Sequence, residues 1–153
     1  QIPTIESVII SKEYPNKITI ELNEYDKIMT ITDLRGSVPK KSTLYKNMIE
    51  IESDDIFLIP SLTITNCPVP PGFNGEMVSL IMTLKSYNLD VNSFNFTYDG
   101  DFFIGEYRST FIDFGKPLDL GSKSSALGSL IENSDCQGEI RFISKEDLVA
   151  NCS

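Results

Sequence analysis

Apolar and polar residues alternate with a period of two along much of this chain, and this alternation constrains its fold more than any other feature. The alternation is clearest over residues 18–22, 78–84 and 94–98. Alternate side chains of an extended strand point to opposite faces, so each segment is expected to turn one face to a core. Shorter runs typical of strands lie at residues 28–32, 49–51, 56–59, 62–65 and 140–143.

The segments between these runs predict turns and few helices. Turns rich in Gly, Pro or Ser lie at residues 35–37, 68–75, 99–100 and 115–117. Short strands separated by such turns are typical of a β-sandwich or a barrel. Only residues 125–132 and 145–150 have the composition for a helical turn or two, and residues 114–133 are predicted to form a long loop. The sequence therefore predicts an all-β fold.

The absence of histidine limits the chemistry that the chain can perform. None of its 153 residues is His, so the commonest general base is missing and no Ser-His-Asp or Cys-His nucleophile can form. Three scattered cysteines without a Cys-x-x-Cys pair do not predict a zinc site. The sequence predicts no catalytic, cofactor-binding or metal-binding residue, and the chain is predicted not to be an enzyme.

The acidic residues are expected to face solvent. Glu50 and Glu52 alternate with isoleucines, which predicts the outer face of a strand. Residues 99–101, Asp-Gly-Asp, lack the rest of a calcium-binding loop, so a plain turn is expected there.

The net charge of −9, from 22 acidic and 13 basic residues, argues against nucleic acid as a partner. No apolar stretch approaches the roughly 20 residues that a membrane-spanning helix needs. Membrane attachment is expected only through an anchor outside these residues. Because the first residue is Gln1 rather than Met, we expect the chain to be a piece of a longer protein.

Cysteines and glycosylation motifs indicate the compartment. Cys136 and Cys152 flank a short loop-strand segment and are predicted to form a disulfide. Cys67 would then be a buried free thiol, or it would pair with a cysteine in another part of the parent protein. The alternative to the disulfide is that all three cysteines are free thiols. Asn95 and Asn151 begin Asn-x-Ser/Thr motifs and are predicted glycosylation sites. Together these features favour an extracellular or cell-surface protein.

One stretch resembles a known family. Residues 64–72, Ile-Thr-Asn-Cys-Pro-Val-Pro-Pro-Gly, precede the apolar segment 78–84 and the Phe-Asn-Phe-Thr-Tyr of residues 94–98. This order resembles the back half of an IPT/TIG domain, the immunoglobulin-like fold of plexins, related receptors and adhesion proteins of social amoebae. Residues 136–152 resemble the Cys-to-Cys stretch of a following repeat, while the front half lacks the family's Gly-rich opening.

The resemblance implies an immunoglobulin-like antiparallel β-sandwich. Residues 1–153 would form a single domain, or a boundary near residue 100 would make residues 101–153 the start of a second repeat. The family also implies a non-catalytic role in binding another extracellular protein, as part of a cell-surface adhesion or recognition protein.

Two alternative functions stay open at this point. The first is a secreted viral or microbial decoy for a host protein, since an acidic surface would suit a basic ligand. The second is a carbohydrate-binding module, against which the absence of Trp counts.

The aromatic cluster of residues 94–114 and the unpatterned segment after it predict the binding surface. Most of the aromatic side chains are expected in the core, and any excess would form an exposed apolar patch of the kind that marks partner surfaces. The predicted partner-binding residues are Phe102, Phe103, Tyr107, Lys116 and Lys123.

Overall fold

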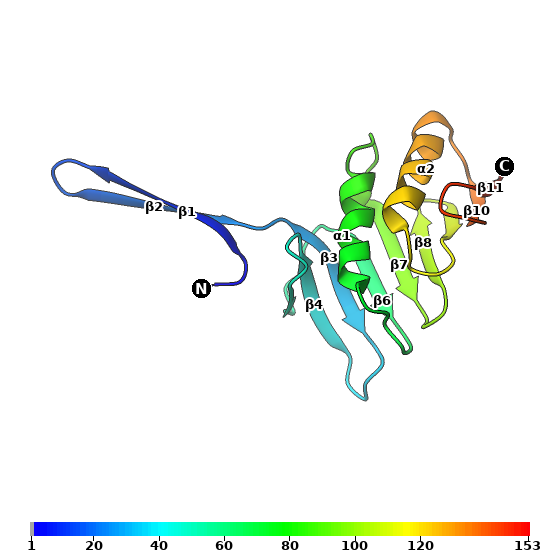
Figure 1. The fold of residues 1–153 in the computed structure, drawn as a ribbon, viewed down its shortest axis with the longest axis horizontal. Coiled ribbons are helices and arrows are strands. Elements are labelled where there is room, and N and C mark those ends of the chain that lie inside the picture. Colours follow the sequence, from blue (N-terminus) through cyan, green and yellow to red (C-terminus); the bar gives the residue numbers. More distant parts are fainter. Residues whose placement is uncertain (1) are drawn as a thin grey trace.

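A nine-stranded mixed sheet with two helices on one of its faces forms the body of the protein, and a separate β-hairpin projects from it (Figure 1). The fold comes from a computed structural model that describes residues 2–153. The hairpin consists of β1 (Ile5–Glu13) and β2 (Lys17–Glu24). The strands of the large sheet are β3 (Lys27–Asp33), β4 (Lys40–Tyr45), β5 (Glu50–Glu52), β6 (Ser61–Ile64), β7 (Phe94–Tyr98), β8 (Phe103–Tyr107), β9 (Thr110–Asp113), β10 (Gly138–Phe142) and β11 (Leu148–Cys152).

The strand order of the large sheet, β11-β10-β9-β8-β7-β6-β3-β4-β5, includes three parallel pairs. Strand β6 runs parallel to β3 and to β7, and β9 runs parallel to β10, whereas the other neighbours are antiparallel. Helix α1 (Phe73–Leu84) connects β6 to β7, and α2 (Leu120–Asn133) connects β9 to β10. Parallel neighbours need such crossover connections, which place the helices on a face of the sheet.

The predicted all-β, immunoglobulin-like antiparallel β-sandwich is therefore wrong. The protein is α/β, because its second layer consists of helices and its large sheet contains parallel pairs. The sheet also continues across residue 100, since β7 pairs with β8 from Phe94↔Tyr107 to Tyr98↔Phe103.

Residues 78–84, which were predicted to form a strand, make up the second half of α1. The buried side chains of this helix follow helical spacing along Phe73, Met77, Leu80, Ile81 and Leu84. Residues four, seven, eight and eleven positions apart share one helix face, so this spacing buries a stripe against the sheet.

Helix α2 occupies the segment that was predicted to be a long loop. Its buried face includes Leu120, Ser124, Leu127 and Gly128, so small residues make up much of the stripe and weaken its hydrophobic signal. The loop prediction for residues 114–133 is thus wrong over α2, whereas the helical composition noted for residues 125–132 is confirmed.

Two shorter predictions are also wrong. Residues 145–150, predicted as helical, include the start of β11. Residues 56–59, predicted as a strand, lie in the connection from β5 to β6, where Ile56 and Leu58 are exposed.

The core lies between the two helices and the sheet, and stacked aromatic rings run through it. Ring centroids are 4.3 Å apart for Phe94 and Tyr107, 5.3 Å for Phe96 and Phe103, and 5.4 Å for Phe114 and Phe142. Contacts at these distances add to the free energy gained from burying the rings. These ring contacts therefore join side chains of β7 to those of β8, and Phe114 to β10, on the same face of the sheet. Within residues 2–153, none of the helices is long and apolar enough to cross a membrane.

Candidate protein-binding surface

The hairpin of β1 and β2 carries one continuous apolar face. Cross-strand register places Val8 opposite Leu22, Ile10 opposite Ile20, and Lys12 opposite Ile18. Directly opposed residues lie on the same side of a two-stranded sheet, as do residues two apart on one strand. We call this surface the apolar hairpin face; its five aliphatic members are Val8, Ile10, Ile18, Ile20 and Leu22.

No part of the body covers this face. Its five aliphatic side chains are between 52% and 68% exposed. The opposite face of the hairpin is mostly polar, and there Asn23 Nδ2 donates to Ser7 Oγ at 3.0 Å. A two-stranded hairpin is at best marginally stable in water without further packing. The apolar hairpin face thus has the composition of a core face and the exposure of a surface.

The base of the hairpin is tied to the body. Tyr25 N donates to Thr4 O at 2.9 Å, and Asn47 Nδ2 donates to Pro3 O at 3.0 Å. A cavity of about 240 Å³ lies beside this junction, and its lining residues are Ile2, Pro3, Ile5, Tyr25, Asn47 and Ile49. Ile5, which lines this base cavity, is paired with Glu24 at the base of the hairpin.

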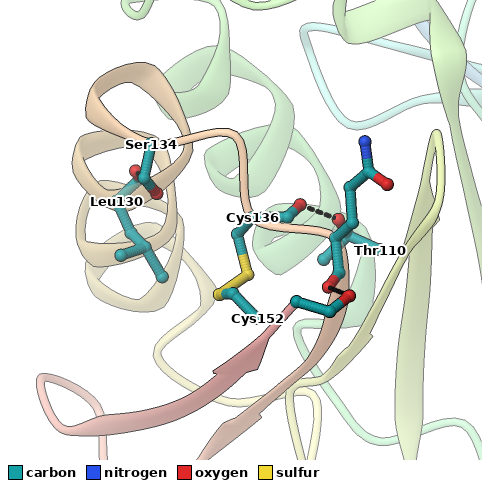
Figure 2. The surroundings of a disulfide bond; sticks show 7 residues. Thr110, Leu130, Ser134, Cys136 and Cys152 are labelled. Atoms are coloured by element: carbon teal, nitrogen blue, oxygen red, sulfur yellow. Dashed lines mark hydrogen bonds between the residues drawn. A yellow bond between two sulfur atoms is a disulfide. The ribbon is translucent and has the colours of Figure 1, made fainter.

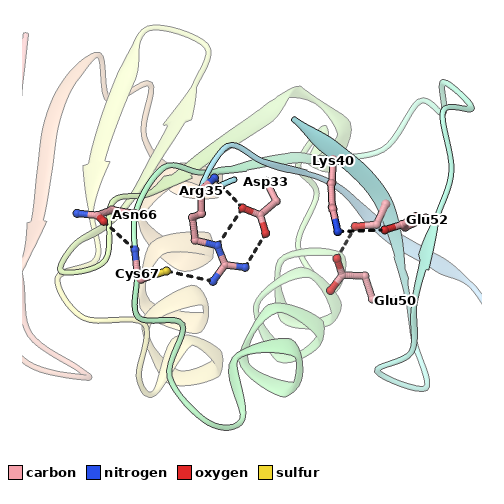
Figure 3. A network of polar contacts seen from close by, with 8 residues as sticks. Asp33, Arg35, Lys40, Glu50, Glu52, Asn66 and Cys67 are labelled. Atoms are coloured by element: carbon pink, nitrogen blue, oxygen red, sulfur yellow. Dashed lines mark hydrogen bonds and ion pairs between the residues drawn. The ribbon is translucent and has the colours of Figure 1, made fainter. Parts of the chain in front are cut away.

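A second candidate site lies where the parallel strands β3 and β6 end. Arg35 donates from Nε to Asp33 Oδ1 at 2.9 Å and from Nη2 to Asp33 Oδ2 at 2.6 Å, and its Nη1 lies 4.0 Å from Cys67 Sγ (Figure 3). These bonds hold the pKa of Asp33 at about 2 and raise the pKa of Arg35.

The Asp33–Arg35 pair leaves little free charge for a ligand. Both carboxylate oxygens of Asp33 are occupied by the guanidinium, and the backbone N–H of Arg35 adds a third bond to Oδ1 at 3.0 Å. The arrangement anchors the turn after β3 next to the turn after β6. Cys67, beside it, is an exposed free thiol.

A third candidate is a polar cavity of about 250 Å³ next to the disulfide. It lies between the turn after β8 and the end of α2, and its lining includes Tyr107, Arg108, Glu132 and Asp135. The hydroxyl of Tyr107 accepts a hydrogen bond from Asp90 N at 3.3 Å. No group of three or more His, Cys, Asp or Glu that could hold a metal ion is found among residues 2–153.

The disulfide predicted between Cys136 and Cys152 is present (Figure 2). Thr110 Oγ1 donates to Cys136 O at 2.5 Å, and Ser134 Oγ donates to Leu130 O at 2.7 Å. The disulfide therefore links the segment that follows α2 to the last strand of the sheet.

The structure separates the predicted partner-binding residues. Phe103 and Tyr107 are buried on the inner face of β8. Lys123 is buried in α2, where its Nζ donates to Phe114 O at 2.6 Å and to Lys116 O at 3.1 Å, and burial lowers its pKa. These three side chains serve the core and the connection to α2, because a partner cannot reach them. Phe102 and Lys116 are exposed.

The two predicted glycosylation residues are on the surface. Asn95 lies on β7, facing away from the helices, and its Oδ1 accepts a hydrogen bond from Ser61 Oγ at 2.6 Å. That bond leaves Nδ2, the atom that glycosylation modifies, available. Asn151 is exposed on β11, next to the disulfide. Glycosylation at both residues stays a prediction.

Sequence reasoning missed the apolar hairpin face. Residues 18–22 were interpreted as a half-buried strand, but the alternation of Val8 and Ile10 was hidden because Ile9 lies between them. The net charge of −9 carries no information about an exposed apolar face. A comparison with protein-family models and a search of curated proteins found no match to this chain.

Proposed function

We propose that this chain is an extracellular, non-catalytic protein-binding domain of a cell-surface adhesion or recognition protein, and that it binds through the apolar hairpin face. The observation that carries this proposal is the exposure of five adjacent aliphatic side chains on an arm that projects from the body. Contiguous exposed apolar patches mark protein interaction sites.

Burial of this face would contribute favourably to the free energy of binding. Full burial of a Val, Leu or Ile side chain stabilises by about 1.5–3 kcal/mol. Since each of the five is already partly covered, covering the rest is worth about 1 kcal/mol per residue. A partner also removes the solvent exposure that makes a lone hairpin marginal.

The disulfide supports the extracellular part of the proposal. Disulfides persist in oxidising compartments and are rare in the cytosol. Cys136–Cys152 joins the segment after α2 to the edge strand β11, which fits a structural bond.

Site-specific photo-cross-linking tests the proposed surface. A benzophenone-bearing residue replaces Ile20 on the apolar hairpin face or, as a matched control, Thr19 on the opposite face of the same strand. The experiment is done on cells that secrete or display the protein. We expect the residue at position 20 to form cross-linked adducts with other protein chains, and the residue at position 19 to form few. Equal adducts at both positions, or none at position 20, would contradict the proposal.

A further inference from the structure

Lys12 and Glu24 are charged residues at opposite ends of the apolar hairpin face, and the exposed Glu6 adds a second carboxylate at the Glu24 end. Lys12 lies near the tip, opposite Ile18, and it forms no ion pair within residues 2–153. Glu24 lies at the base, two residues after Leu22 on the same side of β2. Its carboxylate is half exposed and reaches one cation, Lys27 Nζ at 3.4 Å.

This pattern is complementary to itself when two hairpins pack face to face and antiparallel. A two-fold axis through the middle of the face, perpendicular to the strands, lays β1 of one copy over β1 of the other. It brings Lys12 of each copy to the base of the other hairpin, one strand to the side of Glu24, with the aliphatic residues between the two ends. A parallel arrangement instead brings the Lys12 side chains of both copies to the same end, and it forces the two bodies to the same end of the pair (Figure 1). Like charges in contact oppose that arrangement.

The tip of the hairpin also matches the base cavity. Tyr14 follows β1 at the tip and is 95% exposed. In the antiparallel pair, the tip of one hairpin reaches the base of the other, where the base cavity of about 240 Å³ lies. A phenol ring has a polar end and a large apolar surface, and it fits a cavity lined by Ile2, Pro3 and Asn47.

We infer that the apolar hairpin face binds the same face of a second copy of this chain, as an antiparallel two-fold dimer in which Lys12 pairs with Glu24 and Tyr14 enters the base cavity of the other copy. This inference rests on the proposed function and names its partner. It makes the domain a homophilic contact module.

The size of the face predicts a weak dimer. A nine-residue strand is about 30 Å long, so the face of the two-stranded hairpin covers about 300 Å² per copy. Tyr14 adds about 150 Å². The sum is well below the roughly 800 Å² per partner of a standard stable interface, which places the dimer in the weak, transient class.

Charge exchange tests both the partner and the geometry. The purified chain is analysed by sedimentation over a concentration series, together with Lys12→Glu, Glu24→Lys and an equimolar mixture of the two variants. We expect each variant alone to associate about tenfold more weakly than wild type, because two ion pairs per dimer become like-charge contacts. The mixture should recover association, since the exchanged charges again face opposite charges. Lys17→Glu, on the opposite face of the same tip, is the matched control and should associate as wild type does.

Three outcomes would overturn the inference. A wild-type chain that stays monomeric up to about 1 mM has no homophilic contact of useful strength. A dimer that survives Lys12→Glu, Glu24→Lys and Tyr14→Ala uses another surface. A mixture no stronger than either variant alone excludes the antiparallel pairing. If the chain is monomeric while position 20 cross-links to a different protein, the proposed function stands; if position 20 yields no adduct, both fail.

Discussion

The ion pair of Asp33 and Arg35 is the residue-scale feature that depends most strongly on pH. The guanidinium donates two hydrogen bonds to the carboxylate, and the pKa of Asp33 falls from 3.8 to about 2. A carboxyl group with a lower pKa in the folded state stabilises the fold fully above its unfolded pKa. That contribution disappears as the pH falls through the folded pKa, so the sensitive window lies between about pH 4 and pH 2.

We expect Asp33→Asn to destabilise the fold at about pH 6 by about 1–2 kcal/mol, a value reduced from the full pKa shift because the pair is about a quarter exposed. The loss relative to wild type should shrink toward zero at about pH 2, where Asp33 is half protonated or more. Urea unfolding across this range measures the difference. Glu52→Gln, which removes an exposed partner of Lys40 at 3.8 Å, is the control and should change stability little at any pH. A constant loss from pH 6 to pH 2 would show that ionisation of Asp33 is not the cause.

At the scale of elements, the contact between α2 and the turn that follows α1 depends on a small residue in α2. A Cβ placed on Gly128 would lie 2.4–2.7 Å from ring atoms of Tyr87, which follows α1. The Tyr87 hydroxyl hydrogen-bonds to Ser125 Oγ at 2.9 Å, which holds the ring over α2. Helix α2 therefore approaches this ring closely because position 128 has no side chain.

We expect Gly128→Ala to destabilise the protein by about 1 kcal/mol, because overpacking costs about 1–3 kcal/mol and exceeds the roughly 1 kcal/mol gain in helix propensity. Removing the ring should reverse the sign, so Gly128→Ala in a Tyr87→Ala background should stabilise. This double-mutant cycle in urea isolates the contact. The exposed Ser122→Ala on the same helix is the control, with an expected gain of a few tenths of a kcal/mol. A stabilising Gly128→Ala in the wild-type background would mean that the ring moves away at no cost.

At the scale of the whole molecule, the disulfide restrains the end of the chain. Cys136 and Cys152 are 16 residues apart and join the start of the final hairpin to edge strand β11. A cross-link that closes a loop of about 15 residues reduces the entropy of the unfolded chain, which stabilises the fold by about 3 kcal/mol.

Replacing both cysteines with serine should lower the free energy of unfolding by about 3 kcal/mol, and reductant should do the same to wild type but not to the double variant. Urea unfolding with and without reductant measures this, and intact mass reports the bond. Cys67→Ser is the control, since this exposed thiol is unpaired and its removal should leave stability unchanged. Free thiols at both positions in protein from the secretory pathway would contradict the disulfide.

Residue pattern predicted several features that depend on neighbours in the sequence. Alternation predicted strands at β2 and β7, short apolar runs predicted β3, β6 and β10, and the spacing of the cysteines predicted the disulfide. Local pattern did not distinguish strand from helix over residues 78–84, because Leu80 and Leu84 fit both periods. Met77 and Ile81 resolve the ambiguity only when the window extends back to Phe73.

Tertiary structure alone decided the strand order and the functional surface. The pairing of β6 with β3 and β7 joins segments about thirty residues apart, and such contacts leave no periodic signal in the sequence. The alternation of residues 18–22 predicted a strand with one apolar face. It did not predict whether another element of the fold covers that face. Here the hairpin extends beyond the reach of both helices, so a face with the composition of a core remains exposed to solvent.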